Sequence, residues 1–476
     1  MSLFLEAAHK VEGMMLAQVA GTVSQVVGLT IEADDFAVPV GALARIRLRH
    51  SRRDVEAEVV GFHHDHALLM PLGEARGISR GDPIELVHAR AQIGVGDALL
   101  GRVLDALGNP LDGKPAPRTQ AMAEVFASPP DAMKRPPIRQ ALTTGVRAMD
   151  GLFTCGRGQR VGLFAGSGVG KSSLLGMITR NTDADVIVLA LVGERGRELR
   201  DFIENDLGEE GLRRAVVLCA TSDQPPLLRV RAAFAAHAVA EYFRDRGRNV
   251  VLLLDSVTRL ALAQREIGLS AGEPPTTKGY PPSVFTMMPR LMERAGTNER
   301  GSITAFYTVL VEGDDTNEPI ADTVRGILDG HIWLDRNLAN RGHFPAIRID
   351  DSISRLMSAV AEKEHKELAA RLRRVYTTYR QSEDLINIGA YQRGSNPEID
   401  EAIALMPQIE AFLRQGLGEH VDMAATRQAL GKALNAAGGA PLGPAAGARR
   451  PLPAAKPAAQ RVRKPAAPGP APAPRK

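Results

Sequence analysis

The chain has 476 residues, of which 44% are hydrophobic and 24% are charged, a balance typical of a globular protein with room for about three domains. Its longest apolar runs, such as residues 186–192, are too short to cross a bilayer, and residues 1–10 lack the pattern of a secretory signal. The two cysteines, Cys155 and Cys219, indicate neither a disulfide framework nor a zinc site, so we expect a reducing, cytoplasmic environment.

The net charge of +4 comes from the end of the chain. Residues 438–476 hold eight Lys or Arg, no Asp or Glu, and ten of the 31 prolines, which leaves a net charge of −4 for residues 1–437. Such a segment cannot bury a core, and we expect a disordered, basic tail rich in Pro and Ala. Two interpretations stay open: a solvated appendage, or weak attraction to an acidic partner or to anionic lipid as a peripheral membrane contact.

The first 95 residues fall into two parts. Leu3, Phe4, Leu5 and Val11 predict either a partner-binding helix within residues 1–20 or a frayed terminus. Residues 21–95 alternate apolar and polar positions between glycine turns, which predicts short strands in a small barrel or sandwich. The run His63-His-Asp-His66 has the residue types of a metal site. However, a hairpin turn between residues 55–61 and 67–72 explains it better, because consecutive residues of a strand point to opposite faces.

The rest of the chain changes character three times. Residues 94–137 are rich in Gly and Pro, and we expect a connector with fixed turns. From about residue 145 to residue 349, apolar runs alternate with helical patterns, which predicts a largely parallel sheet covered by helices. Residues 358–437 carry no strand pattern and predict helices, for example over 368–379 and 398–417. The runs predicted as strands are 186–192, 216–220, 250–254 and 302–311.

A glycine-rich loop in Ala165-Gly-Ser-Gly-Val-Gly-Lys-Ser172 is the most specific motif of the chain. An apolar run enters it and a helical run leaves it. Glycines let the backbone turn tightly and point its N–H groups at a phosphate chain, at the positive end of the following helix. In this pattern the lysine reaches the β- and γ-phosphates and the serine hydroxyl binds Mg²⁺. The expected nucleotide-binding residues are Gly166, Ser167, Gly168, Val169, Gly170, Lys171, Ser172 and Ser173.

Two carboxylates follow predicted strands. Asp255 ends the apolar run 250–254, and ligands of parallel sheets lie beyond the carboxyl ends of the strands, so Asp255 is expected at the Mg²⁺ ion. Glu194 follows the run 186–192 and is our candidate for the base that activates the attacking water, with Glu198 as an alternative. The hexapeptide Gly193-Glu-Arg-Gly-Arg-Glu198 alone is equally typical of a charged helical turn with surface ion pairs.

Two further candidates lie near residue 350. Arg355, in Ser352-Ile-Ser-Arg355, is a candidate for an arginine that neutralises the γ-phosphate of a neighbouring subunit. Phe344, in Gly342-His-Phe-Pro345, could stack on adenine, or it could be an ordinary core or turn aromatic.

Together these motifs resemble the flagellar and type III secretion ATPases, which are related to the catalytic subunits of rotary ATPases. The resemblance runs from about residue 21 to residue 430. The segment Gly389-Ala-Tyr-Gln-Arg-Gly-Ser-Asn-Pro-Glu-Ile-Asp400 looks like the secretion branch rather than a rotary β subunit. The other segments that carry the resemblance are Leu100-Gly-Arg-Val-Leu-Asp105, Phe164-Ala-Gly-Ser-Gly-Val-Gly-Lys-Ser172, Gly193-Glu-Arg-Gly-Arg-Glu198, Leu254-Asp-Ser-Val-Thr-Arg-Leu-Ala261, Gly279-Tyr-Pro-Pro-Ser-Val-Phe285 and Gly313-Asp-Asp315.

The resemblance implies an α/β fold with a RecA-like P-loop ATPase core, an N-terminal small β-barrel and a C-terminal helical domain. It also implies assembly into a homohexamer around a central pore. The expected parts are an N-terminal partner-binding segment (1–20), the barrel (21–95), the ATPase domain with its entry connector (96–357), the helical domain (358–437) and the tail (438–476).

The resemblance also assigns roles to the candidates. Lys171 and Ser172 match the phosphate and Mg²⁺ positions, Asp255 the second Mg²⁺ position, Glu194 the water-activating glutamate, Arg355 the trans-acting arginine and Phe344 the adenine-stacking aromatic. One residue departs from the pattern: where the family usually has Asp, Asn or His, this chain has Arg348, at a position near the expected subunit interface.

The function implied is that of the ATP-hydrolysing motor of the flagellar export apparatus, at the cytoplasmic face of the inner membrane, which releases or unfolds export substrates. Its expected partners are a stator-type regulator, export-gate membrane proteins, export chaperones and their substrates, with residues 268–282 as candidates for the pore-facing segment.

Alternatives are a virulence-type secretion ATPase, a rotary ATP synthase subunit, a hexameric nucleic-acid translocase and a nucleotide-gated scaffold without turnover. A translocase needs a basic groove with stacking aromatics, and residues 1–95 hold only three phenylalanines and no Tyr or Trp, so no specific nucleic acid is expected.

Overall fold

The computed structural model describes residues 19–51, 53–311 and 318–435. Most of the expected N-terminal segment, the Gly313-Asp-Asp315 motif and the expected tail lie outside these residues. Among the described residues, no helix combines the length and apolarity needed to cross a bilayer. The same residues contain no group of three or more His, Cys, Asp or Glu side chains that could hold a metal ion.

The first described part is a closed six-stranded barrel, as the alternating pattern predicted. Its strands pair in the order β1-β2-β5-β4-β3-β6, and the apolar residues on their inner faces form a core of their own. The run of histidines is a hairpin turn, since β4 ends at His63 and β5 begins at His66. The barrel strands are β1 (Ala20–Val27), β2 (Thr30–Asp34), β3 (Leu43–Arg47), β4 (Asp54–His63), β5 (His66–Pro71) and β6 (Pro83–His88).

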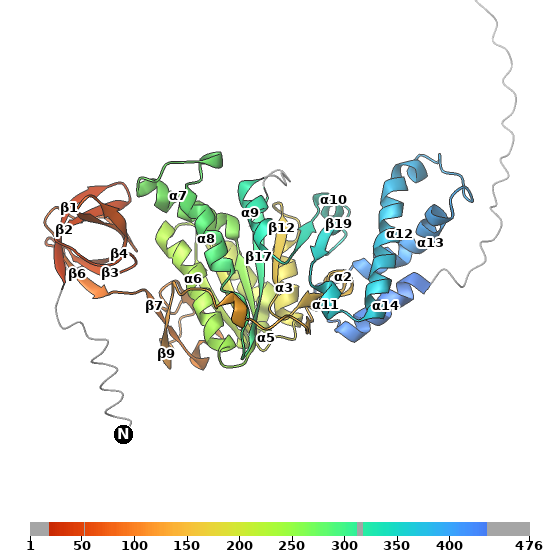
Figure 1. The fold of residues 1–476 in the computed structure, drawn as a ribbon, viewed down its shortest axis with the longest axis horizontal. Coiled ribbons are helices and arrows are strands. Elements are labelled where there is room, and N and C mark those ends of the chain that lie inside the picture. The colour runs from red at the N-terminus through yellow and green to blue at the C-terminus, as the bar shows by residue number, and fades with distance from the viewer. Residues whose placement is uncertain (1–18, 52, 312–317, 436–476) are drawn as a thin grey trace, which may run out of the picture. The chain divides into compact units, whose positions relative to one another are not determined.

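A nine-stranded sheet forms the centre of the chain (Figure 1). Its main order is β19-β18-β12-β17-β15-β13-β14-β8, parallel except for the edge pair β18–β19, and β16 pairs antiparallel with β17. These strands are β8 (Arg102–Asp105), β12 (Arg160–Ala165), β13 (Val186–Val192), β14 (Ala215–Ala220), β15 (Asn249–Asp255), β16 (Gly296–Thr297), β17 (Ser302–Leu310), β18 (Gly330–Leu334) and β19 (Ile347–Ser354).

One strand of this sheet comes from the expected connector. Residues 102–105 were expected among fixed turns, but they form β8, which pairs in parallel with β14 from Val216 to Cys219. β7 (Gln92–Val95), which starts just before the expected connector and is not a barrel strand, pairs with β9 (Ala121–Glu124) in a small antiparallel sheet. The connector therefore contributes the edge strand β8 to the central sheet.

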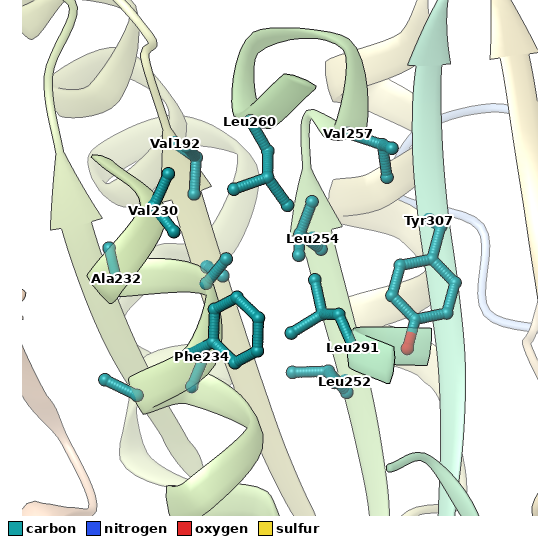
Figure 2. Packing of buried hydrophobic residues seen from close by; sticks show 14 of the residues in the cluster. Val192, Val230, Ala232, Phe234, Leu252, Leu254, Val257, Leu260, Leu291 and Tyr307 are labelled. Atoms are coloured by element: carbon teal, nitrogen blue, oxygen red, sulfur yellow. The ribbon is translucent and has the colours of Figure 1, made fainter. Parts of the chain in front are cut away.

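Both faces of the central sheet are buried, which explains its continuous apolar runs. Along β13, Val188 and Ala190 belong to one core cluster, whereas Ile187 and Leu189 belong to another. On the first face, Phe234 of α6, Leu252 of β15 and Leu291 of α8 belong to one packed cluster (Figure 2). The helices over this face are α6 (Pro226–Arg244), α7 (Val257–Ser270) and α8 (Pro282–Met292).

The opposite face is covered by α2 (Arg147–Leu152), α3 (Lys171–Asn181) and the segment after β13, which comprises α4 (Gly196–Asp201), the π-helix η3 (Phe202–Leu207) and α5 (Gly208–Arg213). Shorter elements are α9 (Pro319–Ile327), α10 (Arg336–Asn340), α11 (Met357–Val360), β10 (Ala141–Leu142), β11 (Cys155–Gly156), and the 3-10 turns η1 (Asp97–Leu99), η2 (Ala132–Lys134) and η4 (Thr277–Gly279).

The last described part is helical, as expected: α12 (Lys363–Asn387), α13 (Pro397–Leu413) and α14 (Met423–Asn435). The helix predicted over 398–417 ends at Leu413. The next residues turn back to the central domain, where the Gln415 amide donates to the carbonyl of Phe344 (2.9 Å) and its side chain accepts from the Arg147 amide (2.7 Å).

Candidate active site

The carboxyl ends of four adjacent strands define the site. In the sheet order β12-β17-β15-β13, the register places Ala165 beside Leu310, and Leu191 beside Asp255. The glycine-rich loop, the Asp255 carboxylate and the Glu194 carboxylate therefore emerge at one edge, where ligands of parallel sheets bind.

The loop after β12 has the conformation expected of a phosphate cradle. Gly170 adopts φ +89°, a backbone conformation that residues other than glycine rarely adopt, and α3 begins at the next residue. The N-terminus of this eleven-residue helix faces the edge of the sheet, which favours an anion there. Ser167, Gly168 and Ser172 are exposed, Gly166 and Val169 are buried, and Lys171 and Ser173 are partly exposed.

Lys171 connects the loop to both carboxylates. Its Nζ contacts Oδ1 of Asp255 and lies 3.6 Å from Oε1 of Glu194. Thr308, on the intervening strand β17, donates a hydrogen bond to Oδ1 of Asp255 (2.7 Å). The structure therefore brings Lys171, Asp255 and Glu194 together, although 84 positions separate the first two.

Glu194 is well placed to accept a proton. It is 8% exposed, and burial, followed by the charge of Asp255, raises its pKa to about 7, while Lys171 and Arg259 act in the opposite direction. Among the residues that the structure describes, its Oε1 atom has no hydrogen-bond partner. A buried carboxyl group with a pKa near 7 suits a general base at neutral pH. By contrast, Glu198 is exposed and pairs with Arg195 (3.6 Å).

Sequence reasoning assigned no role to Arg259 or Thr308. Arg259 lies in the first turn of α7, where its Nη1 is 3.2 Å from Oε2 of Glu194 and also contacts the Gly193 carbonyl. Its position four residues after Asp255, just past a strand end, was the available signal. Thr308 is a polar residue inside the apolar strand β17, which was a weaker one.

Phe344 lies against the loop. A methyl group added at Gly170 would be 3.3 Å from two atoms of the Phe344 ring. The ring is also 42% exposed, so one of its surfaces is open to a ligand. The structure therefore combines Phe344 with the phosphate loop of the same chain.

Arg355 lies at the opposite edge of the sheet. It follows β19, is exposed, and its amide donates to the carbonyl of Asp329 (3.0 Å), which neighbours Arg160 at the start of β12. The phosphate loop begins after Ala165, five residues further along β12, which corresponds to about 17 Å of extended strand. The structure does not bring Arg355 to the loop of its own chain, as an arginine acting in a neighbouring subunit requires.

The unusual Arg348 is fully accommodated. Its guanidinium group pairs with Asp335 (2.7 Å) and with Asp351 (2.9 Å), and its carbonyl accepts a hydrogen bond from the Ser352 hydroxyl (2.6 Å).

Comparisons with known proteins match three parts of the chain to family models. Residues 145–354 match the nucleotide-binding domain of the ATP synthase alpha/beta family, residues 23–87 match the β-barrel domain of that family, and residues 361–432 match the T3SS EscN ATPase C-terminal domain.

Relatives along most of the chain include flagellum-specific ATP synthases and type 3 secretion system ATPases. The flagellum-specific ATP synthase of Bacillus subtilis is 58% identical over 400 residues, covering 84% of this chain and 91% of the relative. The type 3 secretion system ATPase of Xanthomonas euvesicatoria is 50% identical over 395 residues, covering 83% and 89%. The assembled ATPase EscN of enteropathogenic E. coli superposes with a TM-score of 0.82 at 45% identity, covering 87% of this chain and 100% of EscN.

Proposed function

Since the chain belongs to the family of flagellar and type III secretion ATPases, we propose that it is the ATP-hydrolysing motor of a flagellar protein export apparatus. The observation that carries this proposal is the meeting of the phosphate loop, Lys171, Asp255 and Glu194 at one sheet edge, in a chain 58% identical to a flagellum-specific ATP synthase.

The phosphate chain of ATP would lie over the amides of residues 166–172, with Lys171 turned from Asp255 to the β- and γ-phosphates. Asp255 and Ser172 offer a carboxylate and a hydroxyl, which fit Mg²⁺, because this ion takes oxygen ligands and usually one or two from the protein. When bound, Mg²⁺ would neutralise charge on the phosphate oxygens.

Glu194 would take a proton from the attacking water as its oxygen bonds to the γ-phosphorus. The bond from that phosphorus to the β–γ bridging oxygen then breaks, and ADP leaves with the bridging oxygen. Lys171 and Arg259 would stabilise the charge of the transferred group, while the Glu194 proton passes to solvent.

Arg355 would complete the site of a neighbouring copy in a homohexamer, because it is too far from its own loop. The relative EscN forms an assembled ATPase and has been solved with its central stalk EscO. By analogy, we expect stalk- and stator-type regulators, export-gate proteins, chaperones and their substrates as partners, with the ring peripheral to the cytoplasmic face of the inner membrane. Residues 268–282 are the proposed pore-facing segment, and residues 274–278 within it are exposed.

A virulence-type secretion ATPase is the second candidate, because the SPI-2 type 3 secretion system ATPase of Salmonella typhimurium is 54% identical over 363 residues. Deleting the gene in its own host separates the two. Loss of flagella and motility, restored by wild type and not by the Glu194→Gln variant, supports the flagellar function. Normal motility with loss of another secreted set of proteins would contradict it.

The enzymatic half of the proposal is tested with purified protein. ATP turnover of the wild type should vanish in Glu194→Gln while nucleotide binding persists. Persistent turnover in Glu194→Gln would refute the assigned base, and nucleotide binding without wild-type turnover would indicate a nucleotide-gated scaffold.

A further inference from the structure

A loop between β18 and β19 carries Phe344. It leaves the sheet after Leu334, forms α10, passes through Phe344 and returns at Ile347, the first residue of β19. The two ends of this loop are joined at the backbone, because the Asp335 amide donates to the carbonyl of Ala346 (2.8 Å). The base of the loop is therefore narrow, and the ring of Phe344 lies away from it, on the phosphate loop.

A side-chain clamp closes the same base. Nε and Nη2 of Arg348 lie 3.1 and 2.7 Å from Oδ2 of Asp335, so the guanidinium donates two hydrogen bonds to one oxygen. Oδ1 of Asp335 accepts from the Leu338 amide (2.8 Å) and caps α10. The remaining nitrogen of the guanidinium, Nη1, donates a hydrogen bond to Oδ2 of Asp351 (2.9 Å).

The electrostatics favour this clamp. Burial works to raise the pKa of Asp335, but hydrogen bonds from the Leu338 amide and from Arg348 hold the pKa below its ordinary value. The Asp335 side chain is 12% exposed and that of Arg348 is 34% exposed, so the pair is better shielded from solvent than an ordinary surface pair.

The position of the Phe344 ring depends on the narrow end of the loop that Arg348 and Asp335 close. The ring is 42% exposed and lacks the enclosure that fixes a core aromatic. Besides Gly170, the described anchor of the residue is the hydrogen bond from Gln415 to its carbonyl. Because only Pro345 and Ala346 lie between Phe344 and β19, a shift at Arg348 in this strand would also move the ring.

We propose that Arg348 is a positioning residue for recognition of the nucleotide base: it fixes the loop so that Phe344 stays over the phosphate loop and stacks on adenine. The proposal rests on the proposed ATPase function. It distinguishes the adenine of ATP from its phosphate chain, because the Arg348–Asp335 pair acts on the position of Phe344 and leaves the phosphate loop unchanged.

The test compares ATP with inorganic tripolyphosphate, which has the phosphates and lacks the base. In Arg348→Met, the KM for ATP should rise about fivefold with kcat roughly unchanged, the size expected for losing a partly shielded ion pair. The inhibition constant of tripolyphosphate should not change. Arg348→Lys keeps the charge but loses the fork of donors, so its KM should lie between those of wild type and Arg348→Met.

Two controls make the result specific. Arg371→Met removes an ion pair of similar length (2.7 Å, to Glu401) from the C-terminal helices and should change neither constant. Phe344→Ala should reproduce the loss for ATP alone, and adding Arg348→Met to it should cause no further loss, because both act through one ring.

Equal losses for ATP and tripolyphosphate would overturn the proposal and assign Arg348 a general structural role. Additive losses in the double variant would also overturn it. Should Arg348→Met not fold, Arg348→Lys and its combination with Phe344→Ala give the same decision. A wild-type protein that binds tripolyphosphate but does not hydrolyse ATP would refute the proposed function instead.

Discussion

Lys171 contacts Asp255 across β17, so the cation of the phosphate loop also neutralises the carboxylate expected at Mg²⁺. Glu194 shares the same cation at 3.6 Å. Two acidic groups that are 5% and 8% exposed therefore share one lysine, and Glu194 also lies 3.2 Å from Arg259. Binding of a phosphate chain would draw the lysine away and leave the two acids to a metal ion and to Arg259.

Removing this lysine should destabilise the fold as well as stop catalysis. In Lys171→Ala, two buried acids repel each other without their shared cation, and we expect a loss of about 1–3 kcal/mol of unfolding free energy at pH 8. Urea unfolding checks this value. Lys171→Arg should keep most of the stability and still lose turnover. A Lys171→Ala protein as stable as wild type at pH 8 would contradict the shared role.

The pKa of Glu194 predicts how activity depends on pH. A base acts when ionised, and the folded-state pKa of Glu194 is raised from 4.5 to about 7. The value of kcat/KM should therefore increase with pH through a midpoint near 7 and fall about tenfold per pH unit well below it. Steady-state hydrolysis between pH 5.5 and 8.5 measures this midpoint, and a profile that is flat from pH 5.5 would remove Glu194 as the base.

The same shift predicts an effect on stability. A carboxyl whose pKa is raised by folding stabilises the native state fully below 4.5, and this contribution is lost as the pH rises through about 7. Glu194→Gln mimics the protonated form. Its melting temperature should match that of wild type near pH 5 and exceed it at pH 8, and the opposite order would show that the buried acid is stabilised by its surroundings.

Two inactive variants should restore activity when mixed. Glu194→Gln keeps Arg355, and Arg355→Ala keeps Glu194, so a ring containing both forms some complete sites between neighbours. With random mixing, about a quarter of the interfaces combine the intact halves in a cyclic homo-oligomer. Hydrolysis assayed after joint refolding or subunit exchange measures the recovery. Mixtures no more active than the separate variants would refute sharing of sites.

The interface between barrel and ATPase core contains a buried ion pair, Glu58 with Arg231 at 3.2 Å, and both side chains are about 5% exposed or less. Burial outweighs Arg231 and raises the pKa of Glu58 to about 7. In Arg231→Met, Glu58 loses its cation and must take a proton to remain buried. The variant should lose about 3 kcal/mol of unfolding free energy at pH 8 and less at pH 6.

Denaturant unfolding at the two pH values measures that difference. The double variant Glu58→Gln/Arg231→Met carries no titratable group at this position, so the extra loss at pH 8 should disappear. If the pH dependence survives in the double variant, it comes from another group.

Prediction from sequence succeeded where burial is complete and local. The run 186–192 is apolar at every position because both of its faces are covered, and β13 has the predicted bounds. The phosphate loop was predicted for a similar reason, since its glycines, lysine and serine are consecutive. The placement of Asp255 and Glu194 at one edge of the sheet was predicted from their positions at strand ends.

Contacts distant in sequence could not be predicted in the same way. Residues 102–105 give a weak strand signal because they are few and stand among turns; their pairing with β14 depends on an element more than a hundred residues later. The approach of Arg259 to Glu194 needs the order of β13 and β15 in the sheet, which no local pattern contains. The early end of α13 likewise reflects Gln415 reaching back to the core.

The five residues of β12 between the level of Arg355 and the phosphate loop, about 17 Å of extended strand, also bear on when a single copy of the chain can hydrolyse ATP. On the proposed assignment, a single copy of this chain binds nucleotide at a site that lacks its arginine, and its own Arg355 has no neighbouring site to complete. Free copies could then accumulate in the cell without wasting ATP. Assembly of the ring would therefore activate hydrolysis, and ATP would be consumed only where export machinery is being built.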